Sequence, residues 1–231
     1  MGRPLKGTLA FAATALFVAL AATAAIADPR AEARDGNIYA GEGALKQLTT
    51  TGRDAEPILT PDKKAVIFTR QGKRPTGDFD DCTFEGVPDE LRLVWLDGPG
   101  EELLARGHEG KKPEEQLCGF RRKQFSSDGQ LVYFLSPAWT TSSALHVYDR
   151  KAKRVTFVMP ANDVIVLNDC AKAEYRDNLV VQQHRYFVVA GSYDWYWLYD
   201  RAGKKEKGPL GEQDGEEGVR DAIAGVGLCN K

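Results

Sequence analysis

The sequence lacks the patterns that mark the common catalytic and metal sites. No G-x-S-x-G, H-E-x-x-H or P-loop motif occurs in its 231 residues, and no two cysteines stand at C-x-x-C spacing. Its three histidines lie far apart in the sequence, at His108, His146 and His184. These absences argue against hydrolase, zinc and thioredoxin-like sites. We therefore expect no catalytic residue, metal or cofactor, and we interpret the chain as not an enzyme.

Two arrangements come nearest to a metal site. Asp78, Asp80 and Asp81 stand beside Cys82, and hard cations prefer oxygen ligands of this kind. The cluster lacks the glycine and glutamate positions of an EF-hand loop, so we interpret it as a solvated acidic loop. The other arrangement would bring the three histidines together on one axis, which the sequence does not specify.

An excess of one charge is also missing. The chain has 31 basic and 33 acidic residues, which are interspersed, and its formal net charge is −2. Such a balance does not favour nucleic-acid binding, which needs a concentrated basic surface.

A long apolar run occurs only near the N-terminus. Residues 9–26 carry no charge, follow Arg3 and Lys6, and end in the small-x-small pattern 25–27. Residues 1–27 are therefore predicted to be a cleaved signal peptide, with an uncleaved signal anchor as the alternative. Cleavage would leave a net charge of −4, because the segment holds two basic residues and no acidic one. We expect a periplasmic or secreted protein with no later membrane span.

Four cysteines follow this segment. An even number in an exported chain indicates two disulfides, for which three connectivities are possible. We favour pairing between sequence neighbours, which joins Cys82 to Cys118 and Cys170 to Cys229. The second bond would fasten the C-terminal segment, which is rich in glycine and acidic residues.

A turn–strand–strand unit recurs along the rest of the chain. Its clearest copy is residues 124–150, in which a Ser-Ser-Asp-Gly turn precedes two short strands rich in β-branched and aromatic residues. The aspartates that end the second strand of each copy are Asp97, Asp149 and Asp200, spaced 52 and 51 residues apart. A period near 50, with about four strands per unit, is typical of propeller blades.

These copies resemble the repeat of TolB-type periplasmic β-propeller proteins, a WD-like repeat. Residues 60–68, Thr-Pro-Asp-Lys-Lys-Ala-Val-Ile-Phe, are similar to the family pattern S-P-D-G-K-x-I-(A/V)-F, and residues 125–134 repeat it. Residues 145–149 resemble the L-Y-V-x-D strand that follows. The third copy departs from the pattern, since His184 stands where aspartate is usual. In this copy we expect a turn at 183–185, a strand at 186–190 and a short hairpin at Gly191-Ser192. The resemblance covers roughly 45–201 and implies a blade fold with a partner-binding role.

We therefore predict an all-β, propeller-like array of three to four small antiparallel blades in a single domain over 45–231, after a loose lead-in at 28–44. A four-bladed ring could use residues 40–48 and the chain after Gly208. An open array or a two-sheet sandwich are the alternatives. Almost no helix is expected beyond single turns, and the best candidate, 217–223, is interrupted by Gly218.

One strand is unusually aromatic. Period-two alternation places one set of side chains on the same face, with Tyr196 on the opposite face. The members of this set are Tyr193, Trp195, Trp197 and Tyr199. An exposed row of this kind could stack on sugar rings or anchor a protein partner. The alternative, which we favour for Trp197, is packing between blades, so that Tyr196 would behave in the reverse way.

The sequence thus predicts an exported binding or scaffolding protein that contacts another envelope protein, or a glycan. A periplasmic inhibitor or immunity protein is the first alternative, since the chain is small and disulfide-bonded. An enzyme acting on cell-envelope polysaccharide is the second, and it would need a pair of carboxylates in a cleft.

Overall fold

The computed structural model describes residues 28–73, 82, 84, 86–227 and 229, together with Gly2. The acidic cluster of Asp78, Asp80 and Asp81 lies outside the described residues, as does nearly all of the predicted signal peptide.

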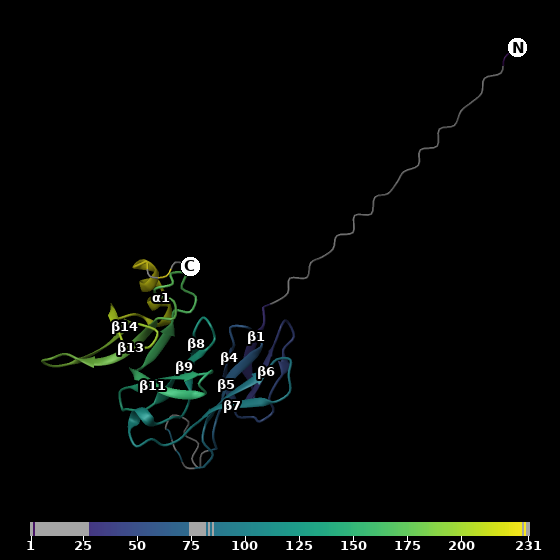
Figure 1. Ribbon diagram of the computed structural model, residues 1–231, viewed down its shortest axis with the longest axis horizontal. Coiled ribbons are helices and arrows are strands. Elements are labelled where there is room, and N and C mark those ends of the chain that lie inside the picture. Colours follow the sequence, from purple (N-terminus) through teal and green to yellow (C-terminus); the bar gives the residue numbers. More distant parts are fainter. Residues whose placement is uncertain are drawn as a thin grey trace.

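Three four-stranded antiparallel sheets follow one another along the chain, and each is built from consecutive strands (Figure 1). Blade 1 consists of β4 (Asp54–Leu59), β5 (Ala65–Arg70), β6 (Glu90–Trp95) and β7 (Glu101–Arg106). Blade 2 consists of β8 (Arg121–Phe125), β9 (Leu131–Pro137), β10 (Ser143–Asp149) and β11 (Arg154–Ala161), and a single 3-10 turn, η1 (Pro113–Glu115), precedes it. Blade 3 consists of β12 (Asp163–Val166), β13 (Leu179–Tyr186), β14 (Ser192–Tyr199) and β15 (Glu206–Gly211). The predicted all-β array of four-stranded blades is confirmed.

The repeated turn motif closes the first hairpin of blades 1 and 2 in the same way. Thr60 donates its hydroxyl proton to Asp62 at 2.6 Å, and Ser126 donates to Asp128 at 2.5 Å. Each carboxylate also accepts a backbone N–H from the residue two positions later. Side-chain acceptors that hold the local backbone are the reason that such residues favour turns.

Alternating side chains of each strand build the interior in layers. One face of blade 1 packs against blade 2, with Ile67 and Leu93 against Phe134 and Tyr148. The other face of blade 2 packs against blade 3. The main residues of this second layer are Tyr133, Leu135, Leu145, Val181, Trp197 and Tyr199. Because successive strand residues point to opposite faces, each blade contributes to two layers.

The N-terminal segment covers the free face of blade 1. Residues 28–44, predicted to be a loose lead-in, instead form β1 (Arg30–Arg34) and β2 (Asn37–Gly41), which pair with each other, and β2 also pairs with β3 (Lys46–Gln47). Ile38 is fully buried and packs with Phe68 of blade 1. The alternation of Ile38 and Ala40 with partly exposed residues gives this short strand a buried face, which the polar residues around it in the sequence conceal.

A helix covers the free face of blade 3. α1 (Gly215–Gly225) spans three turns, so the prediction of only single helical turns is wrong. Val219 and Ile223, four residues apart, lie on one face of α1 and are buried against Tyr196 and Leu198. The Cys170–Cys229 disulfide lies beside this helix, and Cys82 is bonded to Cys118. The fold is therefore an open array of three blades with a different cap on each end.

Candidate functional site

The most distinctive surface feature is the hairpin of β13 and β14, because it is longer than the sheet that supports it. The β12 strand pairs with β13 only as far as Gln182, and β15 pairs with β14 only as far as Tyr196. Beyond these points the two strands pair with each other, from Gln183–Trp195 to Tyr186–Ser192. This outer part, residues 183–195, is called here the projecting hairpin, and it runs out beyond the blades (Figure 1).

The sequence placed this hairpin differently. It predicted a turn at 183–185 and a strand at 186–190, whereas the structure continues β13 through Tyr186 and turns at 187–191. Phe187 donates its backbone N–H to the Gly191 carbonyl at 3.0 Å, and Gly191 adopts a φ of 87°, which glycine tolerates. His184 does not serve as a turn residue. It pairs across the strands with Asp194, Nδ1 to Oδ1, at 2.9 Å.

The shift leaves an apolar tip in solvent. Tyr186 and Phe187 are more than half exposed, and Val188 and Val189 are 104% and 96% exposed. Sequence reasoning missed this tip because the β-branched run was interpreted as a strand. A short hairpin was expected at Gly191-Ser192, and the structure instead begins the turn at Phe187, so that the run 187–190 belongs to the turn and not to a strand.

The aromatic row lies on one face, as period-two alternation predicted. Trp197 is 8% exposed and Tyr199 is buried, and both pack with Met159 and Leu145 of blade 2. Tyr193 and Trp195 are half-buried on the projecting hairpin, with ring centroids 4.8 Å apart. The row therefore passes from the interior to the surface, and a binding role for it remains a prediction.

A polar cluster fixes the point where the projecting hairpin leaves the blade. The guanidinium carbon of Arg185 lies 3.7 Å from the ring centroid of Trp197, and Arg185 donates to Glu206 at 2.8 Å. Tyr199 donates its hydroxyl proton to Gln183 at 2.8 Å. Burial lowers the pKa of Arg185, but the hydrogen bond to Glu206 and the electrostatic attraction of Tyr199 and Glu206 together outweigh it, so the pKa lies above its ordinary value and the charge is retained.

The face of β14 opposite to the aromatic row is also buried where the strand lies within blade 3. Tyr196, expected to behave in the reverse way to Trp197, is buried beneath α1. Its hydroxyl donates to Asp163 at 3.1 Å, and Asp163 also accepts from Arg122 at 2.9 Å. Burial raises the pKa of Tyr196 to about 12, and the nearby Asp163 carboxylate adds to the shift.

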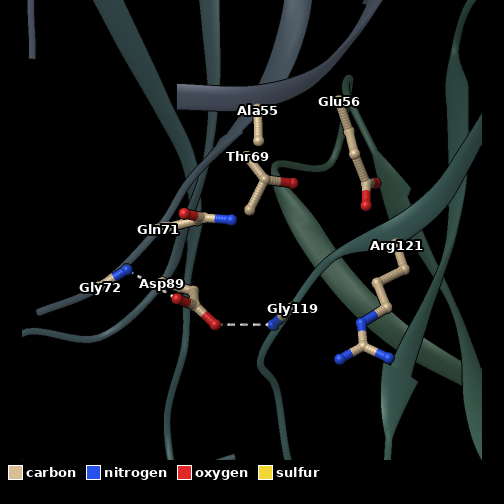
Figure 2. A pocket seen from close by; sticks show the side chains of 8 residues that line it. All are labelled: Ala55, Glu56, Thr69, Gln71, Gly72, Asp89, Gly119 and Arg121. Atoms are coloured by element: carbon tan, nitrogen blue, oxygen red, sulfur yellow. Dashed lines mark hydrogen bonds between the residues drawn. The ribbon is translucent and has the colours of Figure 1, made fainter. Parts of the chain in front are cut away.

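A small cavity between blades 1 and 2 has a polar lining (Figure 2). Its volume of about 60 Å³ suits water rather than a larger ligand. The Asp89 carboxylate accepts the backbone N–H groups of Gly72 and Gly119 at 2.7 and 2.8 Å, which joins blade 1 to the start of blade 2. Nearby, the buried Lys123 ammonium donates to Glu56 and Thr69. These contacts hold the blades together.

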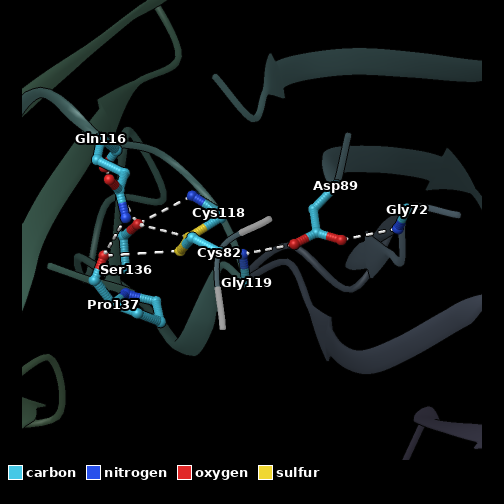
Figure 3. Close-up of a disulfide and its surroundings, with 8 residues drawn as sticks. All are labelled: Gly72, Cys82, Asp89, Gln116, Cys118, Gly119, Ser136 and Pro137. Carbon is cyan, nitrogen blue, oxygen red and sulfur yellow. Dashed lines mark hydrogen bonds between the residues drawn. A yellow bond between two sulfur atoms is a disulfide. The ribbon is translucent and has the colours of Figure 1, made fainter. Parts of the chain in front are cut away.

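The Cys82–Cys118 disulfide lies beside this junction (Figure 3). The backbone N–H of Cys118 donates to the Ser136 hydroxyl at 2.9 Å, and Gln116 donates to the Pro137 carbonyl at 3.4 Å. The disulfide joins Cys82 to Cys118, and the hydrogen bond from Cys118 to Ser136 ties this pair to the end of β9.

The histidines have separate surroundings. His146 is buried, and its Nε2 donates to the Glu114 carbonyl at 3.1 Å, while burial holds its pKa below the ordinary value. His184 belongs to the projecting hairpin. Within the part of the chain that the structure describes, no three histidine, cysteine, aspartate or glutamate side chains are grouped to hold a metal ion. No helix in the described ranges is long and apolar enough to cross a membrane.

The fold places the chain among β-propeller-like proteins, and solved structures support this class. The β-propeller domain of the Trilobed protease from Pyrococcus furiosus, described as having an open velcro topology, is similar at 12% identity with a TM-score of 0.50. That match covers 74% of this chain and 47% of the other. An oligogalacturonate lyase from Vibrio parahaemolyticus is similar at 14% identity and a TM-score of 0.50, over 77% of this chain and 43% of the lyase.

TolB from Acinetobacter baumannii is also similar, at 11% identity and a TM-score of 0.43, over 77% of this chain and 49% of TolB. The predicted resemblance to propeller proteins is confirmed at the level of the fold by the β-propeller domain of the Trilobed protease, at a TM-score of 0.50. The chain spans about half the length of these proteins. No protein-family model matches the sequence, and no curated protein matches it.

The lyase corrects the prediction that the chain is not an enzyme. Its blades are similar to those described above, and it is an enzyme by name. A propeller scaffold without the familiar motifs therefore does not separate binding proteins from enzymes.

Proposed function

We propose that this protein is an exported binding or scaffolding module that makes contact through the projecting hairpin. The observation that carries the proposal is the tip, where four large apolar side chains lie in solvent at the end of a long hairpin. Exposed apolar groups gathered at one place mark contact sites, whereas single ones are ordinary.

The rest of the molecule supports this role because its blades are packed on one another and its two end faces are covered. The layers between the blades are filled, both end faces are capped, and the cluster around Arg185 orients the hairpin. The two disulfides support export, because such bonds persist in oxidising compartments.

Photo-crosslinking would test the proposal directly. A benzophenone amino acid at position 188 of the exported protein should form an adduct with an envelope component, whether protein, glycan or lipid. The same amino acid at position 226, an exposed valine just after α1, is the matched control and should not. The proposal fails if position 188 gives no more adduct than position 226.

A further inference from the structure

The projecting hairpin ends in a stretch with no charge. Residues 186–193, Tyr-Phe-Val-Val-Ala-Gly-Ser-Tyr, contain no acidic or basic side chain. The polar side-chain atoms they offer are the three hydroxyl groups of Tyr186, Ser192 and Tyr193. Whatever covers this tip must therefore bind it mainly by removing apolar surface from water.

The area of the tip limits the kind of partner. Covering Tyr186, Phe187, Val188 and Val189 would bury on the order of 500 Å², judged from the 150–250 Å² of a whole aromatic side chain. One partner in a standard protein interface buries about 800 Å² and shares about ten hydrogen bonds. The tip supplies less area and few donors. A lipid interface requires neither shape complementarity nor a fixed set of hydrogen bonds.

Polarity also changes in order along the hairpin. Val188 and Val189 lie at the turn, and the rings of Phe187 and Tyr193 follow, with centroids 4.7 Å apart. Polar and charged side chains come next, beginning with the hydrogen-bonded pair of His184 and Asp194. Aliphatic, then aromatic, then charged is the order in which side chains occupy a membrane interface from the acyl chains outward.

We propose that the tip of the projecting hairpin inserts into the interfacial region of a lipid bilayer. This inference rests on the proposed function and names the partner of the same site. Insertion depends on apolar burial rather than on anionic headgroups, because His184 and Arg185 each face an acidic partner, Asp194 and Glu206, and the chain is weakly acidic. The hydrogen bond from Phe187 to Gly191 pairs one backbone N–H and one carbonyl of the turn within the protein.

The test places a reporter at the tip of the whole exported protein. Val188→Trp is compared with Val226→Trp in the presence of phosphatidylcholine vesicles that carry brominated acyl chains, each after subtraction of the parent protein's emission. We expect the added emission at position 188 to shift to the blue and to be quenched by bromine, and the emission at position 226 to do neither. Since the reporter is local, the result does not depend on any other apolar segment of the chain.

A second variant separates insertion from general adhesion. Replacing Val188 and Val189 together by aspartate should abolish bromine quenching of a tip reporter, Phe187→Trp. It should also lower the partitioning of the protein into vesicles by about tenfold or more. Val226→Asp should leave both unchanged. Equal bromine quenching at positions 188 and 226 would overturn the lipid assignment. Quenching at position 188 that appears only when the vesicles contain phosphatidylglycerol would overturn it as well. If lipid insertion is overturned but the photo-crosslinking experiment still joins position 188 to a protein, the proposed function stands with a protein partner. If no adduct forms either, the proposed function and the lipid assignment both fail.

Discussion

The inner and outer halves of the β13–β14 hairpin share a pattern of alternating aromatic residues on β14 but lie in different environments. Both carry aromatic residues at alternate positions, and both keep the same antiparallel register. The inner half is covered by blade 2 on one face and by α1 on the other, whereas the outer half extends past its neighbouring strands. Aromatic alternation therefore specifies which face a side chain occupies, and the length of the neighbouring strands decides whether that face is buried.

The largest difference between the halves should appear at Trp197. Its indole N–H has no hydrogen-bond partner in the described part of the chain, so its contribution comes from packing and from Arg185 above the ring. Trp197→Ala should lower the free energy of unfolding by about 3–5 kcal/mol, measured by urea denaturation. Trp197→Phe should cost less, since it keeps a ring in the same space. A loss for Trp197→Ala no greater than that for Val188→Ala would contradict the comparison.

The Cys170–Cys229 disulfide should come next, because it lies beside the helix that covers the second face. Replacing both cysteines by serine should cost roughly 2–4 kcal/mol, by the entropy of the loop that the bond closes. Amide hydrogen exchange at Val219 and Ile223 should accelerate, since α1 then separates from blade 3 more often. The matched control replaces Cys82 and Cys118 instead, and it should leave protection of α1 unchanged. Unchanged exchange in α1 without Cys229 would show that packing alone holds the helix.

A smaller effect should appear at alkaline pH. The folded-state pKa of Tyr196 is about 12, above the ordinary value of 10.0, so the unfolded chain loses this proton first as pH rises. The contribution of Tyr196 is therefore present below about pH 10 and declines between about pH 10 and 12. Tyr196→Phe should be less stable than the wild type at pH 8, and the difference should narrow by pH 11. A constant difference would show that Tyr196 ionises equally in both states.

The smallest effect should be at the tip. Val188→Ser and Val189→Ser should each change the free energy of unfolding by less than about 0.5 kcal/mol, because fully exposed side chains lose no packing. Thermal denaturation in the absence of lipid would measure this. A loss above 1–2 kcal/mol would mean that the tip packs against the protein in solution.

Local sequence was sufficient where local contacts determine the structure. The Ser126–Asp128 and Thr60–Asp62 turns are formed by side chains two residues apart, so the motif itself predicts the hairpin. The strand faces followed from period-two alternation for the same reason. The cysteine pairing of neighbours along the chain also matches the structure.

Distant contacts explain what the sequence did not predict. Ile38 gains its burial from Phe68, and α1 gains its stability from blade 3 and the disulfide beside it rather than from its propensity, which Gly218 lowers. The exposure of Trp195 and Val188 depends on where β12 and β15 end. A binding surface of this kind has no motif, because it is defined by the neighbours that are missing around it.

The two caps also bear on how the number of blades can change. The buried cluster beneath β1–β3 contains strand residues of blade 1 and no other blade, and the cluster beneath α1 contains those of blade 3. The packing of each cap therefore does not depend on how many blades separate the two caps. An in-frame duplication of one repeat, inserted between blades 2 and 3, would therefore meet a blade face on each side and leave both ends intact. The number of blades can therefore change without altering either end of the array. Recombination within such genes could lengthen the array and place the projecting hairpin further from blade 1.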